Sequence, residues 1–249
     1  DLSRWDVSNV TDMGDMFAHA PTFDQDLSAW DVSKVTNMDC MFNNATVFQG
    51  DLSTWDVSSV TNMNSMFGDA WSFNGDLSKW DVSKVTDMCY MFSDARVFNC
   101  DLNSWRTSSL KQMECMFAGA WHFNSDLNNW DVSRVMSMRG VFKKAYGFNG
   151  DVSTWDVRRC ACFEQTFEDA RSFNCDLSAW TPRVPRSGVV SMGGFLYGAD
   201  AFHESLSPLL LEHLRPLGFR RSGRWLWRIA RRRVLVPLIE SHAAYYWMD

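Results

Sequence analysis

The chain has 249 residues, of which 46% are apolar, and a formal net charge of −6 at pH 7. That length is enough for one or two ordinary domains with a sizeable core. No run of 18 apolar residues occurs, which argues against a membrane-spanning helix. Because residue 1 is Asp and no signal peptide is visible, we expect a fragment or a processed chain.

A 25-residue motif, numbered here by position from its first Asp, recurs through most of the chain. Seven units of this length begin at residues 1, 26, 51, 76, 101, 126 and 151, and an expanded eighth unit covers residues 176–204. Every unit has Trp at position 5. Self-similarity at this period is typical of a solenoid, in which each unit is buried by its neighbours. We therefore predict one solenoid over residues 1–204.

The first part of each unit predicts a short strand. Apolar residues stand at positions 2, 5, 7 and 10, which are Leu2, Trp5, Val7 and Val10 in the first unit. This spacing is that of a leucine-rich repeat, and the alternation over positions 5–8 is typical of a strand with one buried face. We predict a parallel strand at about positions 4–8, with the Trp column in the core rather than exposed for carbohydrate stacking.

The second part of each unit predicts a short helix. Positions 13, 16, 17, 20 and 23 are Met, Met, Phe, Ala and Phe in the first unit, a stripe with helical spacing, and Thr11 precedes it as a cap. We interpret the stripe as core rather than as a cofactor site. The expected fold class is α/β: a leucine-rich-repeat-like right-handed solenoid with one short parallel strand and one short helix per coil.

Acidic residues at positions 1 and 6 have no place in the predicted core. We interpret position 1 as a turn ladder, with cation binding as the alternative. Position 6 faces away from the core by strand parity, and carboxylates stacked about 5 Å apart repel. Three interpretations remain open: hydrogen bonding to neighbouring Ser residues, an acidic strip for a partner, or a row of metal sites. The candidate partner-binding residues are Asp6, Asp31, Asp56, Asp81, Arg106, Asp131, Asp156, Ser33, Ser58, Ser83 and Lys79.

In the fifth unit Arg106 replaces the position-6 acid. Because Asp81 and Asp131 flank it in the neighbouring units, we predict an Asp–Arg–Asp ladder across three coils.

The sequence offers little for catalysis. The seven Cys residues form no CxxC pair, and we expect free thiols, with Cys89 and Cys115 near enough to approach each other. No phosphate-binding loop, nucleophile elbow or zinc-protease motif occurs. We therefore expect no enzyme, no cofactor and no metal site.

The C-terminal residues 205–249 change character. They hold eight Arg against three acids, a net charge of +5, which leaves −11 for residues 1–204. We expect a basic cap or a loosely ordered tail. Contact with a membrane or nucleic acid and an unrelated appended sequence are the alternatives. The Arg cluster that suggests membrane contact is Arg228, Arg231, Arg232 and Arg233.

The motif DLSxWDVSxVTxMxxMFxxAxxFNG closely resembles the repeats of BspA-like leucine-rich-repeat surface proteins over residues 1–204. The resemblance implies a cell-surface or secreted protein that takes part in adhesion and binds host or matrix proteins. It implies no cofactor and no catalytic residue. This chain departs from the pattern at Arg106 and Thr107, in its Cys-rich seventh unit and in the expanded eighth.

Together these observations predict a non-enzymatic, monomeric repeat protein. Its partner is expected to be a protein or an extracellular matrix ligand, bound on the exposed sheet face. We expect no nucleic acid partner and membrane contact only through the basic tail. Two alternatives remain: a structural spacer array, or a cation-dependent adhesive module.

Overall fold

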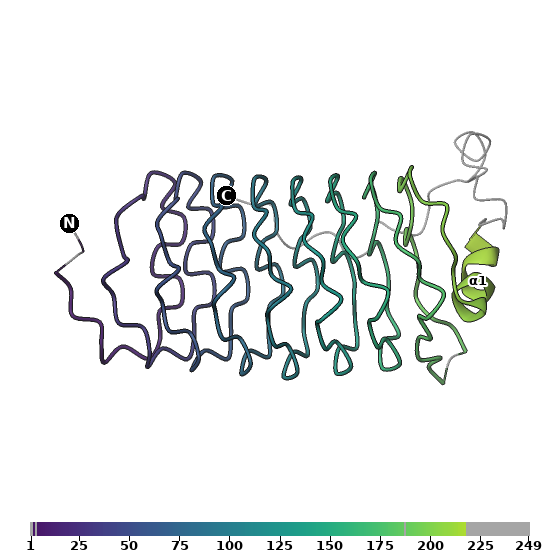
Figure 1. The fold of residues 1–249 in the computed structure, drawn as a ribbon, viewed down its shortest axis with the longest axis horizontal. Helices are drawn as coiled ribbons and strands as arrows, with labels where there is room; N and C mark the ends of the chain where they lie inside the picture. Colours follow the sequence, from purple (N-terminus) through teal and green to yellow (C-terminus); the bar gives the residue numbers. More distant parts are fainter. Residues whose placement is uncertain (1, 3, 187, 218–249) are drawn as a thin grey trace, which may run out of the picture.

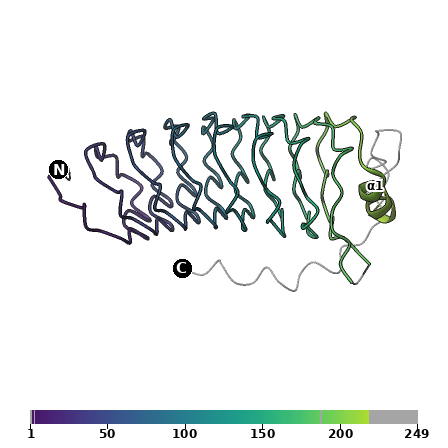
Figure 2. The same cartoon turned by 60° about the horizontal axis from the view of Figure 1, so that its bottom comes forward.

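The computed structural model describes residues 2, 4–186 and 188–217. Successive 25-residue units form coils that lie side by side along the long axis of the molecule (Figure 1). Isolated parallel bridges join position 12 of one coil to position 12 of the next, as in Asn37↔Asn62 and Asn62↔Asp87. A single α-helix among these residues, α1 (Pro208–Leu214), and the 3₁₀ turn η1 (Arg215–Leu217) follow the last coil. Figure 2 shows α1 at the same end of the stack from a second direction.

The coils contain turns where we predicted helices. In the second coil the N–H groups of Cys40 and Asn44 donate to carbonyl oxygens of the third coil, at 2.8 and 2.7 Å. Both residues have left-handed backbone conformations, with φ of 54° and 57°. An α-helix needs negative φ throughout and N–H groups bonded four residues back within the same segment. The stack therefore replaces the expected helix with a series of turns whose alternate N–H groups bond the next coil.

The expected strand at positions 4–8 is also a pair of turns. In the third coil the N–H of Trp55 donates to Leu52 O at 3.1 Å, and the N–H of Val60 donates to Val57 O at 2.9 Å. The Thr at position 11 does not cap a helix either. Instead, the N–H and the hydroxyl of Thr36 both donate to Thr11 O of the preceding coil, at 2.8 and 3.1 Å. Local periodicity identified the buried face but not the backbone conformation.

The predicted apolar positions form the core. In the interior coils they are buried, and each kind of residue stacks on its equivalents along the array. Phe67 illustrates this: its ring centroid lies 5.6 Å from that of Phe42, 5.7 Å from Phe92 and 4.0 Å from Phe73 within its own coil. Stacked aromatic pairs contribute about 0.5–1.5 kcal/mol beyond the burial of their area. The buried positions of the third coil are Leu52, Trp55, Val57, Val60, Met63, Met66, Phe67, Ala70 and Phe73.

The ends of the array differ. The indole of Trp5 is 55% exposed because it packs on one neighbouring coil only, whereas Trp30 is 4% exposed. At the other end, Leu210 and Leu214 of α1 are buried in the core cluster. The Ser207 hydroxyl caps α1 by accepting from the N–H of Leu210 at 3.2 Å. The predicted Arg cluster of the tail, and everything else after residue 217, lies outside the described residues.

Candidate functional site

The position-6 carboxylates are engaged by the residue two places later. The N–H groups of Ser33, Ser58 and Ser83 donate to the preceding Asp at 3.0 Å in each case. In the first coil the hydroxyl of Ser8 donates to Asp6 Oδ1 at 2.6 Å. These are Asx turns, in which a short carboxylate satisfies the local backbone. The hydrogen bonding expected for this column is therefore present.

The same bonds favour the charged form of the acids. Donation from the Ser33 hydroxyl, followed by that from its N–H, lowers the pKa of Asp31 below its ordinary value. The pKa of Asp81 is lowered in the same way by Ser83, and further by the charges of Arg106 and Lys84. Asp31 and Asp81 are thus stabilised as carboxylates mainly by groups of their own coils.

The predicted Asp–Arg–Asp ladder does not form as ion pairs. Arg106 is exposed, and among the described residues no carboxylate oxygen lies within 4.0 Å of its guanidinium. Because a long exposed side chain is well solvated, holding it against a carboxylate gains little. The other departure in this unit has a clear role: Thr107 is buried, and its hydroxyl donates to Asp131 O at 3.1 Å in the next coil.

The remaining position-4 and position-6 candidates are spread along the array. Lys79 is exposed at a turn and contributes to lowering the pKa of Asp76, after the hydrogen bonds from Ser78. Asp131 accepts from the N–H of Ser133 at 3.0 Å. Asp156 is paired instead with Arg158, which replaces the usual Ser. The structure therefore places the predicted candidates on a rim of turns rather than on an open sheet face.

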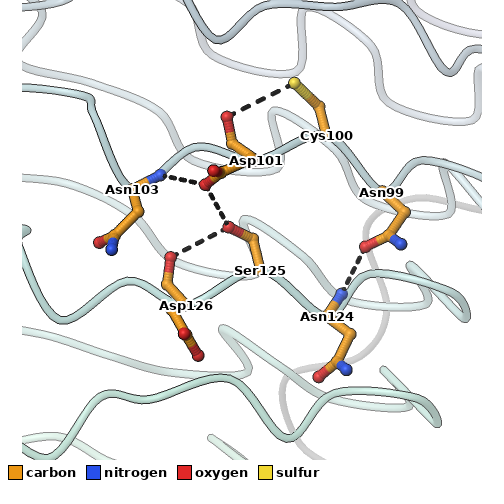
Figure 3. A pocket seen from close by; sticks show the side chains of 7 residues that line it. All are labelled: Asn99, Cys100, Asp101, Asn103, Asn124, Ser125 and Asp126. Carbon is orange, nitrogen blue, oxygen red and sulfur yellow. Dashed lines mark hydrogen bonds between the residues drawn. The ribbon is translucent and has the colours of Figure 1, made fainter.

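A polar pocket of about 320 Å³ is lined by residues of the fourth, fifth and sixth coils (Figure 3). Its side chains already bond one another: the hydroxyl of Ser125 donates to Asp101 Oδ1 at 3.2 Å, and the N–H of Asn124 donates to Asn99 Oδ1 at 2.8 Å. Because these groups serve the turns of adjacent coils, we do not take the pocket as the functional site. Its lining is Asn99, Cys100, Asp101, Asn103, Asn124, Ser125 and Asp126.

The strongest surface feature is one that we did not predict. Position 21 carries large side chains in five consecutive coils, and they stack along the array. We call this set the aromatic edge. It consists of Trp71, Arg96, Trp121, Tyr146 and Arg171.

The guanidinium of Arg96 lies between two indoles of the aromatic edge. Its carbon is 4.4 Å from the ring centroid of Trp71 and 4.7 Å from that of Trp121. The edge continues through Tyr146, 5.9 Å from Trp121, to Arg171, whose guanidinium carbon is 4.6 Å from the Tyr146 ring. All three cation–ring distances are within the roughly 6 Å range of a cation–π interaction.

The backbone holds these side chains in register. The N–H of His122 donates to Arg96 O at 3.2 Å, and that of Gly147 donates to Trp121 O at 2.9 Å. Such bonds repeat between other pairs of coils, as from the N–H of Ser172 to Tyr146 O at 3.2 Å. The edge is therefore presented by a fixed scaffold.

The cationic part of the edge is poorly satisfied by the protein itself. The Nε atom of Arg96 is buried without a hydrogen-bond partner, and no described carboxylate lies within 4.0 Å of this side chain. Nearby Asp94 has a raised pKa, first because of burial and then because of Asp69. Trp71 and Trp121 remain 41% and 38% exposed. An exposed aromatic strip with unpaired donors has the chemistry of a recognition surface.

The repeats match the model of one known protein family. The family model described as "Mycoplasma protein of unknown function, DUF285" matches residues 1–105 and again residues 98–209. The chain belongs to this family. Neither the curated proteins nor the solved structures contain a match to the chain.

In this DUF285 chain two buried thiols, those of Cys89 and Cys160, are poor nucleophiles. All seven Cys residues are free, so Cys89 and Cys115 are not bonded. Burial raises the pKa of Cys89 and of Cys160 to about 12 each. A thiol is reactive only as its thiolate. Cys89 and Cys160 therefore behave as small packing residues.

The described part of this DUF285 chain has neither a metal-binding cluster nor a membrane-spanning helix. No group of three or more His, Cys, Asp or Glu side chains among residues 2–217 as described is arranged to hold a metal ion. No helix within the same described part is long and apolar enough to cross a membrane.

The sequence contains a signal for the aromatic edge, but this signal is not a residue that recurs in every unit. Position 21 is not one of the repeated positions, since it is Pro21 in the first unit and Thr46 in the second, followed by the five edge residues. Reading the chain at intervals of 25 residues brings Trp71, Arg96 and Trp121 into one column. A run of aromatic and Arg residues in a column that the scaffold leaves free was the available clue.

Proposed function

We propose that the chain is a non-catalytic repeat protein that binds another protein through its aromatic edge. The observation that carries this proposal is the exposed Trp71–Arg96–Trp121 stack. Trp, Tyr and Arg are the residues most enriched at the energetic centres of protein interfaces. In the edge they are held in place before binding, which reduces the entropy lost on association.

The surroundings of the edge support a protein partner over a carbohydrate one. Sugars stack on the open faces of aromatic rings, whereas both indoles here turn a face to the guanidinium of Arg96. The adjacent position 22 exposes Val47 and Val97, at 42% and 41%. Apolar groups beside aromatic rings and a guanidinium match the mixed composition of a protein interface.

We propose the cell surface as the site of action. The support is the likeness of the repeat motif to BspA-like leucine-rich-repeat surface proteins. It also leads us to propose a host or matrix protein as the partner and a monomeric chain. The DUF285 match itself supports a repeat family of unknown function.

A structural spacer is the second candidate. The observation that favours it is that the position-6 acids bond within their own coils, as Asp56 does with Ser58. A rim whose carboxylates are already hydrogen-bonded within the protein needs no partner to satisfy them. Under this proposal the aromatic edge serves only the stability of the array.

A binding comparison separates the two. The chain and two variants are immobilised, and capture of purified surface and matrix proteins is measured. The edge variant carries Trp71→Ser and Trp121→Ser, and the matched rim variant carries Asp31→Asn, Asp56→Asn and Asp81→Asn. We expect the edge variant to lose a captured protein that the rim variant keeps, with both variants folded by circular dichroism. Full capture by the edge variant would reject the proposed site.

A further inference from the structure

A second pocket lies on the rim between the sixth and seventh coils. Its volume is about 400 Å³, and it is lined by Ser133, Arg134, Asp156, Arg158 and Arg159. We call it the arginine pocket. The sixth and seventh coils are adjacent and in register through the parallel bridge Ser137↔Cys162. Arg134 and Arg159 occupy the same position of these two coils, 25 residues apart.

One of the three guanidinium groups is already paired. Arg158 donates to Asp156 through Nε at 2.8 Å and through Nη2 at 2.5 Å, a two-point contact. The Asp156 carboxylate is therefore hydrogen-bonded to Arg158, and its pKa is lowered to about 2, chiefly by this side-chain hydrogen bond and further by the charges of Arg158 and Arg159. The Asp156–Arg158 pair lines the pocket and is neutral overall.

The other two guanidinium groups have no such partner. Among the described residues, no carboxylate oxygen lies within 4.0 Å of the guanidinium nitrogens of Arg134 or Arg159, and neither guanidinium donates a hydrogen bond. With three Arg residues and one Asp, the lining carries a net charge of +2.

The rest of the rim avoids this arrangement. Position 9 is Lys34, Ser59, Lys84 and Ser109 in the second to fifth coils, so no two basic residues are adjacent there. Lys34 also has a partner, since its Nζ donates to Asn9 Oδ1 at 2.7 Å. The alternation ends only where Arg134 is followed by Arg159. The fold does not require two adjacent Arg residues at position 9, because other coils have Ser at the same position.

We propose that the arginine pocket binds a phosphate- or sulfate-type oxyanion between Arg134 and Arg159. A guanidinium presents a planar set of N–H donors that matches the oxygens of such an anion, and two of them offset a double negative charge. The Ser133 hydroxyl lines the same pocket and supplies a further donor. The site is independent of the aromatic edge, which lies on a different part of each coil.

The oxyanion has two possible sources, and the same measurement series separates them. Thermal unfolding is followed with inorganic phosphate or sulfate, against chloride at the same ionic strength. Co-sedimentation is measured with vesicles of phosphatidic acid in phosphatidylcholine, against phosphatidylcholine alone. The variants are Arg134→Gln and Arg159→Gln. Arg106→Gln is the matched control, because Arg106 is an exposed rim Arg outside the pocket.

We expect either a rise of the unfolding midpoint specific to phosphate and sulfate, or binding specific to the phosphatidic acid vesicles. The first outcome assigns a free or soluble oxyanion and the second a lipid headgroup. In both cases each pocket variant weakens the effect at least tenfold, while Arg106→Gln retains it. The proposal is overturned if neither probe acts beyond its control, or if the pocket variants respond like the wild-type chain.

Discussion

The indole N–H of Trp105 donates to the carbonyl oxygen of Leu77, 2.9 Å away in the preceding coil. Trp105 is 1% exposed, so this bond is made in the core, where Leu77 O also accepts from the N–H of Trp80 at 3.1 Å. The bond links position 5 of one coil to position 2 of the coil before it, and so contributes to register as well as packing. It recurs from Trp30, Trp55, Trp80, Trp130, Trp155 and Trp180.

The Trp column therefore depends on its nitrogen atoms as well as its rings. Trp105→Phe keeps an aromatic ring but removes one of the two donors to Leu77 O, which still accepts from the N–H of Trp80 at 3.1 Å. We expect the free energy of unfolding to fall by at least the roughly 0.5–1.5 kcal/mol of a typical hydrogen bond, measured by urea denaturation. The control is Trp5→Phe, because Trp5 is 55% exposed and its indole N–H has no acceptor among the described residues. Equal losses in the two variants would show that ring size alone matters.

The core could be predicted from the sequence, and the backbone conformation could not. Apolar residues at fixed positions must be buried whether they lie on a strand, a helix or a turn. The N–H partners, however, lie in the next coil, and the pattern within one unit does not encode them. The available signal was the residues that tolerate a left-handed conformation, such as Asn44, Asp69 and Gly119, at a position that we assigned to a helix.

The candidate site also has one part that the sequence predicts and one part that it does not. The bonding of Asp31 to Ser33 follows from their spacing, because an Asx turn is a local interaction. The stacking of Arg96 between Trp71 and Trp121 is not local. It depends on the register of three coils, and it involves a position whose residue changes from unit to unit. Repeated residues therefore do not reveal such a column, because its residue type changes from unit to unit.

Gly119 tests the left-handed turns directly. Its φ is +68°, and a Cβ atom built there would overlap the Asp94 carboxylate. We expect Gly119→Ala to lower the free energy of unfolding by more than about 2 kcal/mol, since a left-handed Ala alone costs roughly 1–2 kcal/mol. Gly193→Ala is the matched control, because Gly193 has ordinary φ and no atom within 4 Å of its Cβ position. We expect that control to change stability by no more than about 0.5 kcal/mol. A similar cost for both variants would argue against the turn conformation described here.

The aromatic edge predicts a measurable coupling between neighbours. A double-mutant cycle with Trp71→Leu and Arg96→Met removes the ring and the charge while keeping apolar bulk. We expect a coupling energy of about 0.5–1 kcal/mol in thermal or urea unfolding, the range of a partly exposed cation–π pair. The cycle of Trp71→Leu with Arg171→Met should give no coupling, because Arg171 stacks on Tyr146 in a distant coil. Coupling in the second cycle equal to that in the first would mean that the edge does not act through direct stacking.

Two Asp residues predict opposite dependences on pH. The pKa of Asp94 is raised from 3.8, first by burial and then by Asp69, so its carboxylate opposes folding once it is charged. Asp94 therefore favours the folded state most at low pH, and this contribution is lost as the pH rises through its folded pKa. We expect Asp94→Asn to be more stable than the wild-type chain at about pH 7 and to lose that advantage at about pH 3. Asn is suited to the site because it tolerates the left-handed φ of 54°.

Asp31 is the matched case with the opposite sign. Its pKa is lowered from 3.8 by the Ser33 hydroxyl and N–H, so its contribution is present above 3.8 and is lost as the pH falls through the folded value. Asp31→Asn should be less stable than the wild-type chain at about pH 7, and the difference should shrink at about pH 3. Urea unfolding of the three proteins at both pH values measures the two effects together. The prediction fails if the stability of both variants, relative to the wild-type chain, changes in the same direction between pH 7 and pH 3. Asp31 and Asp94 would then not have folded-state pKa values shifted in opposite directions.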